Sequence, residues 1–580
     1  QFLRRYLAPQ RPAVLLMVEL LLAGIGLQLV GPQVVRGFID AAQRGTSVGV
    51  LVWVALLFIG VSAAQQAMSV LAEYWSERVA WTATNSLRAD LAAHLLRLDA
   101  GFHKAHTPGE LIERVDGDVN TLAGFFSSFV VQIGGSALLL LGVLVAVYLV
   151  DPRLGLAFTA FVALALLLLA WVRRFGIPFQ RADRERSAAF YGYVGEVLTA
   201  TEDLRASGAV PYAMRRLFAH LQAWFPIALR GEVRGSAVWA TAIALFAVGD
   251  AIAYGLGGGL YRSHAISLGA VYLVVAYTAT LAQPIETIRT HLQDLQRADA
   301  GLARVRELLA IRSRLEDGTA VLPPGPLSVE FRAVRFSYED EPPDGAIRTP
   351  EQARVLDGLS FRLEAGRVLG LLGRTGSGKT TIGRLLFRLY DPQEGAVFLG
   401  NIDLRAARIA ALRSRVGLVT QDVQLFEASL RDNLTFFDPA VADQRLLAVL
   451  RTLGLQPWLD RLPDGLDTPI SGASLSAGEA QLLALARVFL KDPGLVILDE
   501  ASSRLDRPTE TLLERALRTL LRGRTAIIIA HRLATVEQAD DILLLEDGRI
   551  LEHGPRERLA ADPGSRFAAL CRAGGAEVLA

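Results

Sequence analysis

The sequence predicts two parts of different fold class, an all-α six-helix transmembrane domain followed by an α/β domain with a parallel sheet. Three observations predict this division. Long apolar stretches are concentrated in the first half, a glycine-rich turn lies at 373–381, and strand-like and helix-like segments alternate after it. The chain has 580 residues, too many for one core, and 52% of them are hydrophobic, which is high for a soluble protein.

Six stretches have the roughly 20 apolar residues that a helix needs to cross a bilayer. They lie at about 13–35, 48–71, 122–150, 154–172, 237–260 and 266–285. Short polar turns join them in pairs, whereas the connections at about 75–120 and 174–235 are long, charged and helical in pattern. Arginines are frequent in these connections and in the N-terminal arm, which indicates the cytoplasmic side. We therefore expect a cytoplasmic N-terminus and helices that continue as long cytoplasmic extensions.

Each long connection has a sharp break near its middle, at Thr107-Pro108-Gly109 and at Ser207-Gly208. The pattern predicts two helical hairpins whose tips lie near 108–118 and 202–212. The alternative is that the two connections are unrelated soluble insertions.

Two carboxylates lie inside predicted spans, Glu19 in the first and Asp250 in the fifth. A carboxylate within a membrane is costly and usually faces a cavity or a partner. Both residues are candidates for substrate contact; the alternative is that they satisfy neighbouring helices or a second subunit.

A domain boundary is predicted at 313–326, where the chain is charged and then rich in proline and glycine. The transmembrane domain is thus 1–312 and the α/β domain 327–580. The net charge of +1 argues against a nucleic-acid partner, and the single cysteine excludes an internal disulfide framework.

The segment Gly373-Arg374-Thr375-Gly376-Ser377-Gly378-Lys379-Thr380-Thr381 fits G-x-x-x-x-G-K-[ST], the phosphate-binding loop. A short apolar run precedes it and a run with helical spacing follows, so the glycines lie at a strand-to-helix turn. Glycines there let the backbone approach phosphate oxygens. Lys379 supplies a charge for the terminal phosphates and Thr380 a hydroxyl for Mg²⁺. A chance glycine-rich turn is the alternative.

Further features follow this loop. Leu475-Ser476-Ala477-Gly478-Glu479 opens a helix, an apolar run at 495–498 ends in Asp499-Glu500, and another at 525–529 precedes His531. With the loop and the six spans, this combination resembles the ATP-binding cassette (ABC) transporters, and within them the exporter half-transporters. The resemblance covers nearly the whole chain, and other phosphate-loop ATPases do not share the helix-opening motif.

The resemblance implies ATP and Mg²⁺ as cofactors and gives roles to the matching residues. The residues expected to bind the nucleotide are Tyr338, which stacks on adenine, the Walker A loop 373–381, Gln421 near Mg²⁺ and the γ-phosphate, and the signature residues Ser476, Gly478 and Glu479. The residues expected to contact the metal ion are Thr380, Gln421 and Asp499. The expected catalytic residues are Glu500, which polarises the attacking water, and His531, which contacts the γ-phosphate. Residues 503–506 resemble the loop that crosses to the other nucleotide site, and the hairpin tips resemble coupling helices.

The signature departs from the family pattern Leu-Ser-Gly-Gly-Gln at Ala477 and Glu479. A carboxylate at Glu479 lies near the γ-phosphate that the signature meets in a dimer, which weakens that contact. Because Glu500 and His531 are intact, the pattern favours one half of a heterodimer with a second half-transporter over a homodimer.

The predicted function is ATP-driven export of a lipid, a drug-like amphiphile or a peptide across the cytoplasmic membrane. Alternatives are an ATP-gated regulatory membrane protein without translocation, against which the intact Glu500 argues, and a soluble DNA-repair ATPase, against which the six spans argue. The sequence does not identify the substrate.

Overall fold

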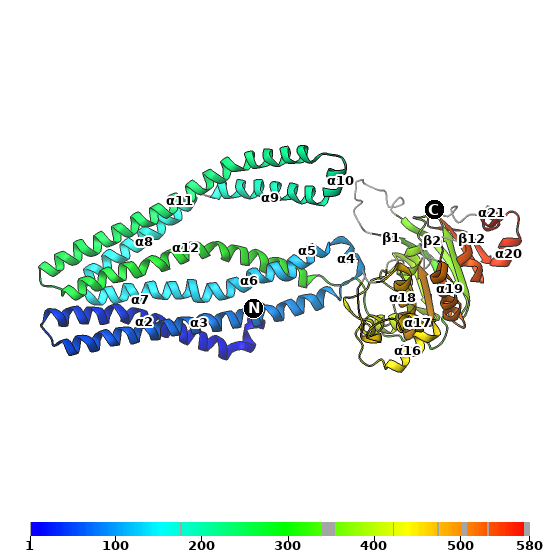
Figure 1. The fold of residues 1–580 in the computed structure, drawn as a ribbon, viewed down its shortest axis with the longest axis horizontal. Helices are drawn as coiled ribbons and strands as arrows, with labels where there is room; N and C mark the ends of the chain where they lie inside the picture. Colours follow the sequence, from blue (N-terminus) through cyan, green and yellow to red (C-terminus); the bar gives the residue numbers. More distant parts are fainter. Residues whose placement is uncertain are drawn as a thin grey trace. The chain divides into compact units, whose positions relative to one another are not determined.

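The chain forms two compact units, one of Gln1–Leu96 with Gly109–Ile311 and the other of Arg97–Pro108 with Arg312–Ala580. The computed structural model describes residues 2–174, 177–338, 354–420, 423–471, 475–499, 507–530 and 533–572. Each unit has its own hydrophobic core among these residues, and the ribbon in Figure 1 shows the helical and the mixed part.

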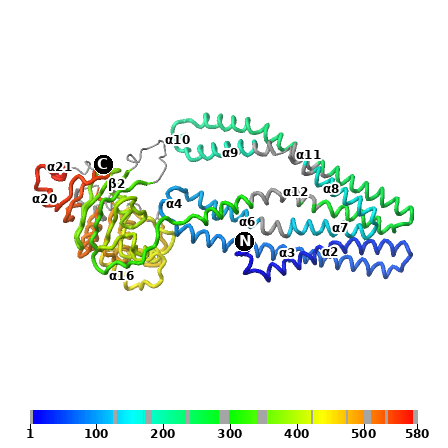
Figure 2. The backbone as a smooth tube through the Cα atoms, turned by 180° about the vertical axis from the view of Figure 1, so that it is seen from behind, coloured from blue at the N-terminus to red at the C-terminus, as the bar shows by residue number. Residues whose placement is uncertain are grey.

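The first unit is helical and is built from antiparallel neighbours. Figures 1 and 2 both show α2 beside α3 and α9 beside α11, and α7 also packs on α8 and α11 on α12. The elements are α1 Phe2–Leu7, η1 Ala8–Gln10, α2 Arg11–Gln43, α3 Val48–Leu95, α5 Pro108–Ile112, η2 Glu113–Gly117, α6 Asp118–Ser127, η3 Ser128–Gly134, α7 Gly135–Val150, α8 Pro152–Arg174, α9 Ile177–Thr199, α10 Thr201–Ala206, α11 Val210–Arg262 and α12 Leu268–Ala310.

Apolar side chains from α7, α8, α11 and α12 form the core of this unit, with Phe158 and Tyr277 almost fully buried. Polar contacts fix the helices at one end. Asp40 near the end of α2 accepts hydrogen bonds from the Ser267 hydroxyl at 2.8 Å and from the Gly269 backbone N–H at 2.9 Å. Asp40 thereby satisfies an otherwise unpaired N–H at the start of α12, which is a structural role.

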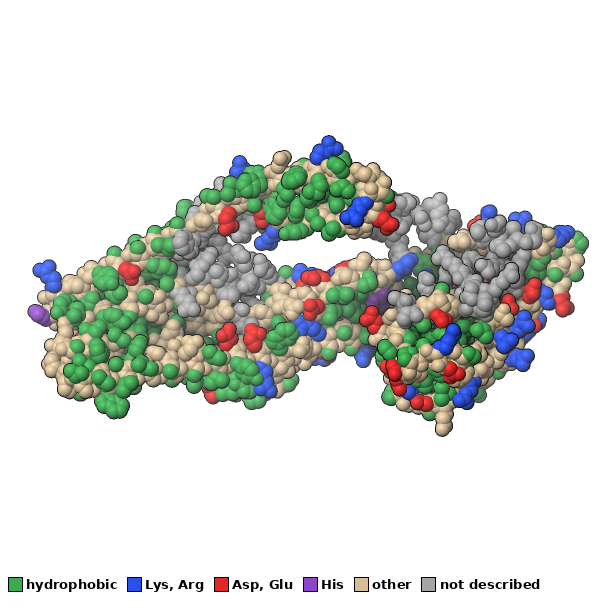
Figure 3. Space-filling model, viewed as in Figure 1, with side chains coloured by type: hydrophobic (Ala, Val, Ile, Leu, Met, Phe, Trp, Pro, Cys, Tyr) green, Lys and Arg blue, Asp and Glu red, His purple; other side chains and the backbone are tan. Residues whose placement is uncertain are grey.

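The outer faces of this unit are strongly apolar. Hydrophobic side chains cover wide areas of the helices in Figure 3, and Leu149 and Leu167 are among the exposed ones. Among the described residues, the helices Arg4–Gln43, Val48–Leu95, Val131–Val150 and Ile243–Arg262 are long and apolar enough to cross a membrane, and Pro152–Leu168 and Leu268–Ala282 are shorter apolar helices. A surface this apolar needs a non-aqueous environment or a partner.

The second unit is an α/β domain with a largely parallel six-stranded sheet of order β12-β11-β3-β10-β9-β6. A four-stranded sheet of order β2-β1-β4-β5 and the small pair β7-β8 accompany it. The strands are β1 Val329–Ser337, β2 Arg354–Leu363, β3 Val368–Gly373, β4 Glu394–Leu399, β5 Ile402–Asp403, β6 Val416–Val419, β7 Ala428–Ser429, β8 Pro469–Ile470, β9 Leu495–Asp499, β10 Thr525–Ile529, β11 Asp541–Glu546 and β12 Arg549–Pro555.

The helices of this unit are α4 Ala100–Ala105, α13 Lys379–Leu386, α14 Ile409–Arg415, α15 Leu430–Thr435, α16 Asp443–Thr452, α17 Gln456–Leu459, η4 Gly465–Asp467, α18 Ala477–Lys491, α19 Arg507–Leu521, η5 Leu533–Gln538, α20 Arg556–Ala561 and α21 Arg566–Arg572. Alternate residues of a strand point to opposite faces, so Val496 and Leu498 of β9 join one core whereas Leu495 and Ile497 join the other.

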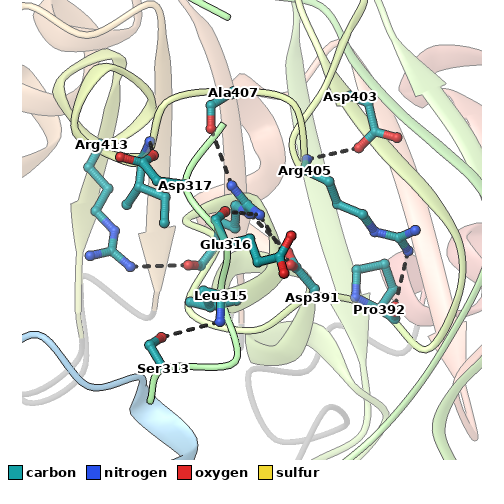
Figure 4. Close-up of polar contacts among 12 residues, drawn as sticks. Ser313, Leu315, Glu316, Asp317, Asp391, Pro392, Asp403, Arg405, Ala407 and Arg413 are labelled. Carbon is teal, nitrogen blue, oxygen red and sulfur yellow. Dashed lines mark hydrogen bonds and ion pairs between the residues drawn. The ribbon is translucent and has the colours of Figure 1, made fainter. Parts of the chain in front are cut away.

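The segment after α12 is bound tightly to this α/β unit, as Figure 4 shows. The buried guanidinium of Arg388 donates to the backbone carbonyls of Glu316 at 2.8 Å and Ala407 at 3.2 Å, and it pairs with Asp391 at 3.0 Å. The Asp317 carboxylate accepts a hydrogen bond of 2.7 Å from the Ile409 backbone N–H. Side-chain contacts thus hold the start of the predicted linker 313–326 against the rest of the α/β unit.

The tip of the first long hairpin also belongs to the α/β unit. Asp99 accepts hydrogen bonds from the Phe102 backbone N–H at 3.1 Å, which caps α4, and from the Arg314 backbone N–H at 2.9 Å. The helix joined to this unit is therefore α4, just before Pro108. The range 108–118, predicted for the tip, covers α5 and η2, while 202–212 covers α10 and the start of α11.

Candidate functional site

The phosphate loop lies between β3 and α13, as the sequence predicts. All six residues of β3 are buried, and the strand pairs in parallel with β10 on one side and β11 on the other. Gly378, at the start of α13, has a left-handed φ of 101°. A Cβ atom there would lie 2.7 Å from the Leu356 side chain and 2.9 Å from the Val355 carbonyl oxygen. Only glycine fits this position, so the sharp turn is a requirement of the packing.

Two polar groups of the loop are buried and face its interior. The Lys379 ammonium donates hydrogen bonds to the carbonyl oxygens of Gly373 at 2.6 Å and Arg374 at 2.9 Å, although its side chain is buried. The buried hydroxyl of Ser377 has no hydrogen-bond partner among the described residues. A buried donor without a partner costs about 1–3 kcal/mol, which an added acceptor recovers. Phosphate oxygens supply such acceptors, so this loop fits a nucleoside triphosphate.

The other residues of the motif complete the loop. Arg374, Thr375, Gly376 and Thr380 are exposed, whereas Thr381 is buried. The Thr381 hydroxyl lies 3.1 Å from the Tyr338 hydroxyl, so the structure brings the predicted adenine-stacking tyrosine against the loop helix. The rings of Phe336 and Tyr390 meet the Tyr338 ring nearly at right angles, with centroids 4.9 and 5.3 Å away.

Two cations that sequence reasoning missed contact Tyr338. The Arg384 guanidinium donates to the Tyr338 hydroxyl at 3.0 Å, and the Lys104 ammonium lies 4.4 Å from the ring centroid. Burial by itself lowers the pKa of Arg384, but its bond to Tyr338 and the charge of nearby Asp499 leave that pKa above its usual value. Lys104 comes from α4, so the hairpin tip contacts the tyrosine of the candidate nucleotide site. One signal was in the sequence, because Lys104 is one of very few lysines.

Asp499 ends β9 at the carboxyl edge of the sheet, where ligands bind in open α/β sheets. It pairs in register with Ile529, the last residue of β10, which itself neighbours β3. The carboxyl ends of β3, β10, β9 and β6 therefore follow one another along the edge that carries the loop. Gln421, Glu500 and His531, and the crossing loop 503–506, lie outside the described residues.

The signature segment opens α18 as predicted, and Ser476 is its N-cap. The Glu479 carboxylate accepts hydrogen bonds from both the backbone N–H and the hydroxyl of Ser476, each at 2.8 Å. In return the Ser476 hydroxyl accepts a bond of 3.3 Å from the Glu479 backbone N–H. This reciprocal capping box holds a carboxylate against the hydroxyl that the resemblance assigns to a γ-phosphate. Gly478 is buried beside it.

The two carboxylates predicted for substrate contact belong to the helical unit. Glu19 is exposed on α2 and Asp250 is half-buried on α11. The helical unit has a cavity between α2, α3, η3, α7 and α12, and neither Glu19 nor Asp250 lines it. Its lining includes a different acidic pair, Glu73 and Glu77 of α3.

Comparison with known proteins identifies the family. The model of the ABC transporter transmembrane region matches residues 14–285, and the ABC transporter model matches residues 356–503.

Among curated proteins, the chain is 30% identical to the ATP-dependent lipid A-core flippase of Chromohalobacter salexigens, covering 89% of this chain and 87% of that protein. It is 31% identical to a multidrug efflux ATP-binding/permease protein of Mycobacterium bovis over 97% of this chain, which is 46% of that longer protein. The solved structure of a bacterial Atm1-family ABC exporter with ATP bound superposes with a TM-score of 0.80 and 26% identity, over 98% of this chain and 99% of that one.

The fold class is thereby confirmed, and ATP is the ligand that the loop binds. The chain belongs to the ABC transporter family, as an exporter-type member in which a transmembrane region is fused to a nucleotide-binding domain whose ATP hydrolysis drives transport.

Proposed function

We propose that this chain is one half of a dimeric exporter that moves an amphiphilic substrate, a lipid, a drug-like molecule or a peptide, out across the cell membrane. The observation that carries this is the joining of a helical unit with apolar outer faces to a phosphate loop with a buried lysine and an unpaired buried hydroxyl. The arginine-rich extensions support a cytoplasmic N-terminus and a cytoplasmic nucleotide-binding domain. The relatives named for multidrug efflux and lipid A-core flipping support the drug-like and the lipid class, respectively.

We assign the nucleotide site as follows. Lys379 leaves the carbonyl oxygens it now bonds and neutralises the terminal phosphates, and Ser377 donates its free hydroxyl to a phosphate oxygen. Tyr338 carries the adenine. Thr380, Asp499 and Gln421 supply oxygen atoms, the ligand type that Mg²⁺ prefers, and the bound ion would offset charge on the phosphates.

Catalysis is assigned to two residues that follow neighbouring strands. Glu500 comes directly after Asp499 at the end of β9, and His531 follows Ala530 just beyond β10. Glu500 takes the proton of the attacking water, and His531 contacts the γ-phosphate. Positioning and electrostatics supply most of the acceleration in such phosphoryl transfers.

A pair of variants tests these roles. Glu500→Gln is expected to retain ATP binding and to lose turnover, whereas Lys379→Ala is expected to lose both, because the lysine charge acts on the bound ground state as well. ATP binding to the purified full-length protein and phosphate release are the two measurements. Full ATPase activity in Glu500→Gln would contradict the assignment.

We further propose that the dimer is a heterodimer. The Ser476–Glu479 capping box supports this, because a signature serine bonded to a carboxylate is a poor ligand for a phosphate anion. The Walker residues of this chain would form the hydrolytic site with a partner's signature, while its own signature would complete a weaker site. Purification of the tagged chain from its native membrane tests the idea. A homodimer with two equally active sites would refute it.

A further inference from the structure

The cavity that contains the acidic pair has the size of a small-molecule site. It has a volume of about 420 Å³, within the range of about 300–1,000 Å³ that is usual for ligand pockets. Leu21 and Ile25 of α2 contribute apolar surface, while Gln28 of α2 and Gln132 of η3 contribute amide groups. The lining is thus amphipathic, as a site for a molecule with apolar and polar parts would be.

The charged side chains that line this cavity, among the described residues, are all acidic. Glu73 and Glu77 are four residues apart on α3, so they lie on the same face of the helix and repel each other. Both side chains are exposed, and neither carboxylate has a hydrogen bond or an ion pair within the described part of the chain. The described residues that line the cavity include no lysine, arginine or histidine. Two negative charges therefore face an amphipathic cavity without compensation from its described walls.

Asp40, another acidic residue of the helical unit, shows what a structural carboxylate looks like here. Asp40 accepts two hydrogen bonds at the start of α12 and is accounted for by them. Glu73 and Glu77 directly follow the second predicted span, where α3 leaves the apolar region. Acidic side chains in transmembrane helices that face a cavity commonly mark a substrate or ion pathway.

We propose that this cavity binds an amphipathic organic cation, with its positive group between Glu73 and Glu77 and its apolar part against α2. The inference rests on the proposed export function and names the substrate class for it. Recognition is by charge, since no aromatic ring belongs to the described lining. The cavity volume suits one drug-sized molecule and is too small for a whole lipid with several acyl chains.

Two probes of equal shape and opposite charge test this directly. Tetraphenylphosphonium and tetraphenylborate are titrated into the purified full-length protein in nanodiscs without nucleotide, and binding is measured by equilibrium dialysis. We expect the wild type to bind the cation in preference to the anion. The double variant Glu73→Gln/Glu77→Gln should lose about tenfold in affinity for the cation, because two attractive charges are removed at constant side-chain size.

Glu232→Gln is the matched control, because it removes an exposed carboxylate of the same unit, on α11, outside the cavity lining. It should bind the cation as the wild type does, and all variants should give the same size-exclusion profile. Equal cation affinity in the wild type and the double variant, a preference for tetraphenylborate, or no binding of the cation to the wild type would each overturn the inference.

The binding experiment is separate from transport. If cation binding depends on Glu73 and Glu77 but vesicles show no ATP-driven accumulation of any probe, the export function fails and the cation site stands. If vesicles accumulate a probe with ATP, but the wild type and the double variant bind the cation equally, the export function stands and the cation site fails.

Discussion

Replacing Glu479 by Gln isolates the effect of one charge in the signature segment. The glutamine side chain keeps an oxygen that accepts from the Ser476 N–H and hydroxyl, so the capping box and the start of α18 are preserved. Glu479→Ala removes both the charge and the box, at a cost of roughly 0.5–2 kcal/mol in helix stability. The difference between these two variants separates electrostatics from helix capping.

The magnitude follows from the geometry of the box. The carboxylate oxygen lies 2.8 Å from the Ser476 hydroxyl, and a phosphate oxygen bonded to that hydroxyl would lie about 5 Å from it or nearer. At about 5 Å, two unit charges repel by about 1 kcal/mol in water and by about 3 kcal/mol at an effective dielectric constant of about 20. Removing the charge should therefore strengthen nucleotide binding at this signature by about 5- to 150-fold.

The assay is photolabelling with azido-ATP of the dimer in nanodiscs, with the label on each chain measured separately over a range of nucleotide concentrations. In a heterodimer, Glu479→Gln should lower the half-saturating concentration for the partner chain, whose Walker residues meet this signature, and leave the label on this chain unchanged. In a homodimer both sites would shift together. An identical nucleotide dependence in the wild type and Glu479→Gln would refute the electrostatic reasoning.

Two further predictions concern contacts of the α/β unit. Lys104→Met removes the cation over the Tyr338 ring, an interaction worth about 0.5–1 kcal/mol. Amide hydrogen exchange in α4 should therefore become faster in the nucleotide-free protein, whereas Lys104→Arg should keep the protection of the wild type. Equal exchange in the wild type and Lys104→Met would contradict the contact. Burial by itself raises the pKa of Glu552, but the backbone N–H groups of Arg566 and Phe567 and the Ser565 hydroxyl leave it below its usual value. The stabilisation from this bonding is fully present at a pH above the ordinary glutamate pKa of about 4.3, and it is lost as the pH falls through the lowered pKa of the folded state. Acidification should therefore lower the melting temperature of the wild type more than that of Glu552→Gln. Melting temperatures that fall equally with pH in the two proteins would contradict this reasoning.

The sequence alone determined the features that depend on local composition and spacing. Six apolar stretches, the glycine pattern of 373–381 and the strand that ends in Asp499 are each contained in a short segment, and the comparisons confirm the fold class that they predict. The Ser476–Glu479 capping box can also be predicted from the sequence, because Ser-x-x-Glu at the start of a helix is a capping signature. The family resemblance, however, assigns this motif only a contact with phosphate.

Only the tertiary structure decided the features that join distant segments. The Pro108 break marked where a helix ends, but the bond from Asp99 to the Arg314 N–H decided that α4, on its N-terminal side, belongs to the α/β unit. Likewise, spacing identified Glu19 as an intramembrane carboxylate, yet the packing of α2, α3, α7 and α12 decided that Glu73 and Glu77 line the cavity. The physical reason is that a local motif fixes backbone conformation, whereas burial and charge balance depend on which residues far apart in the chain pack together.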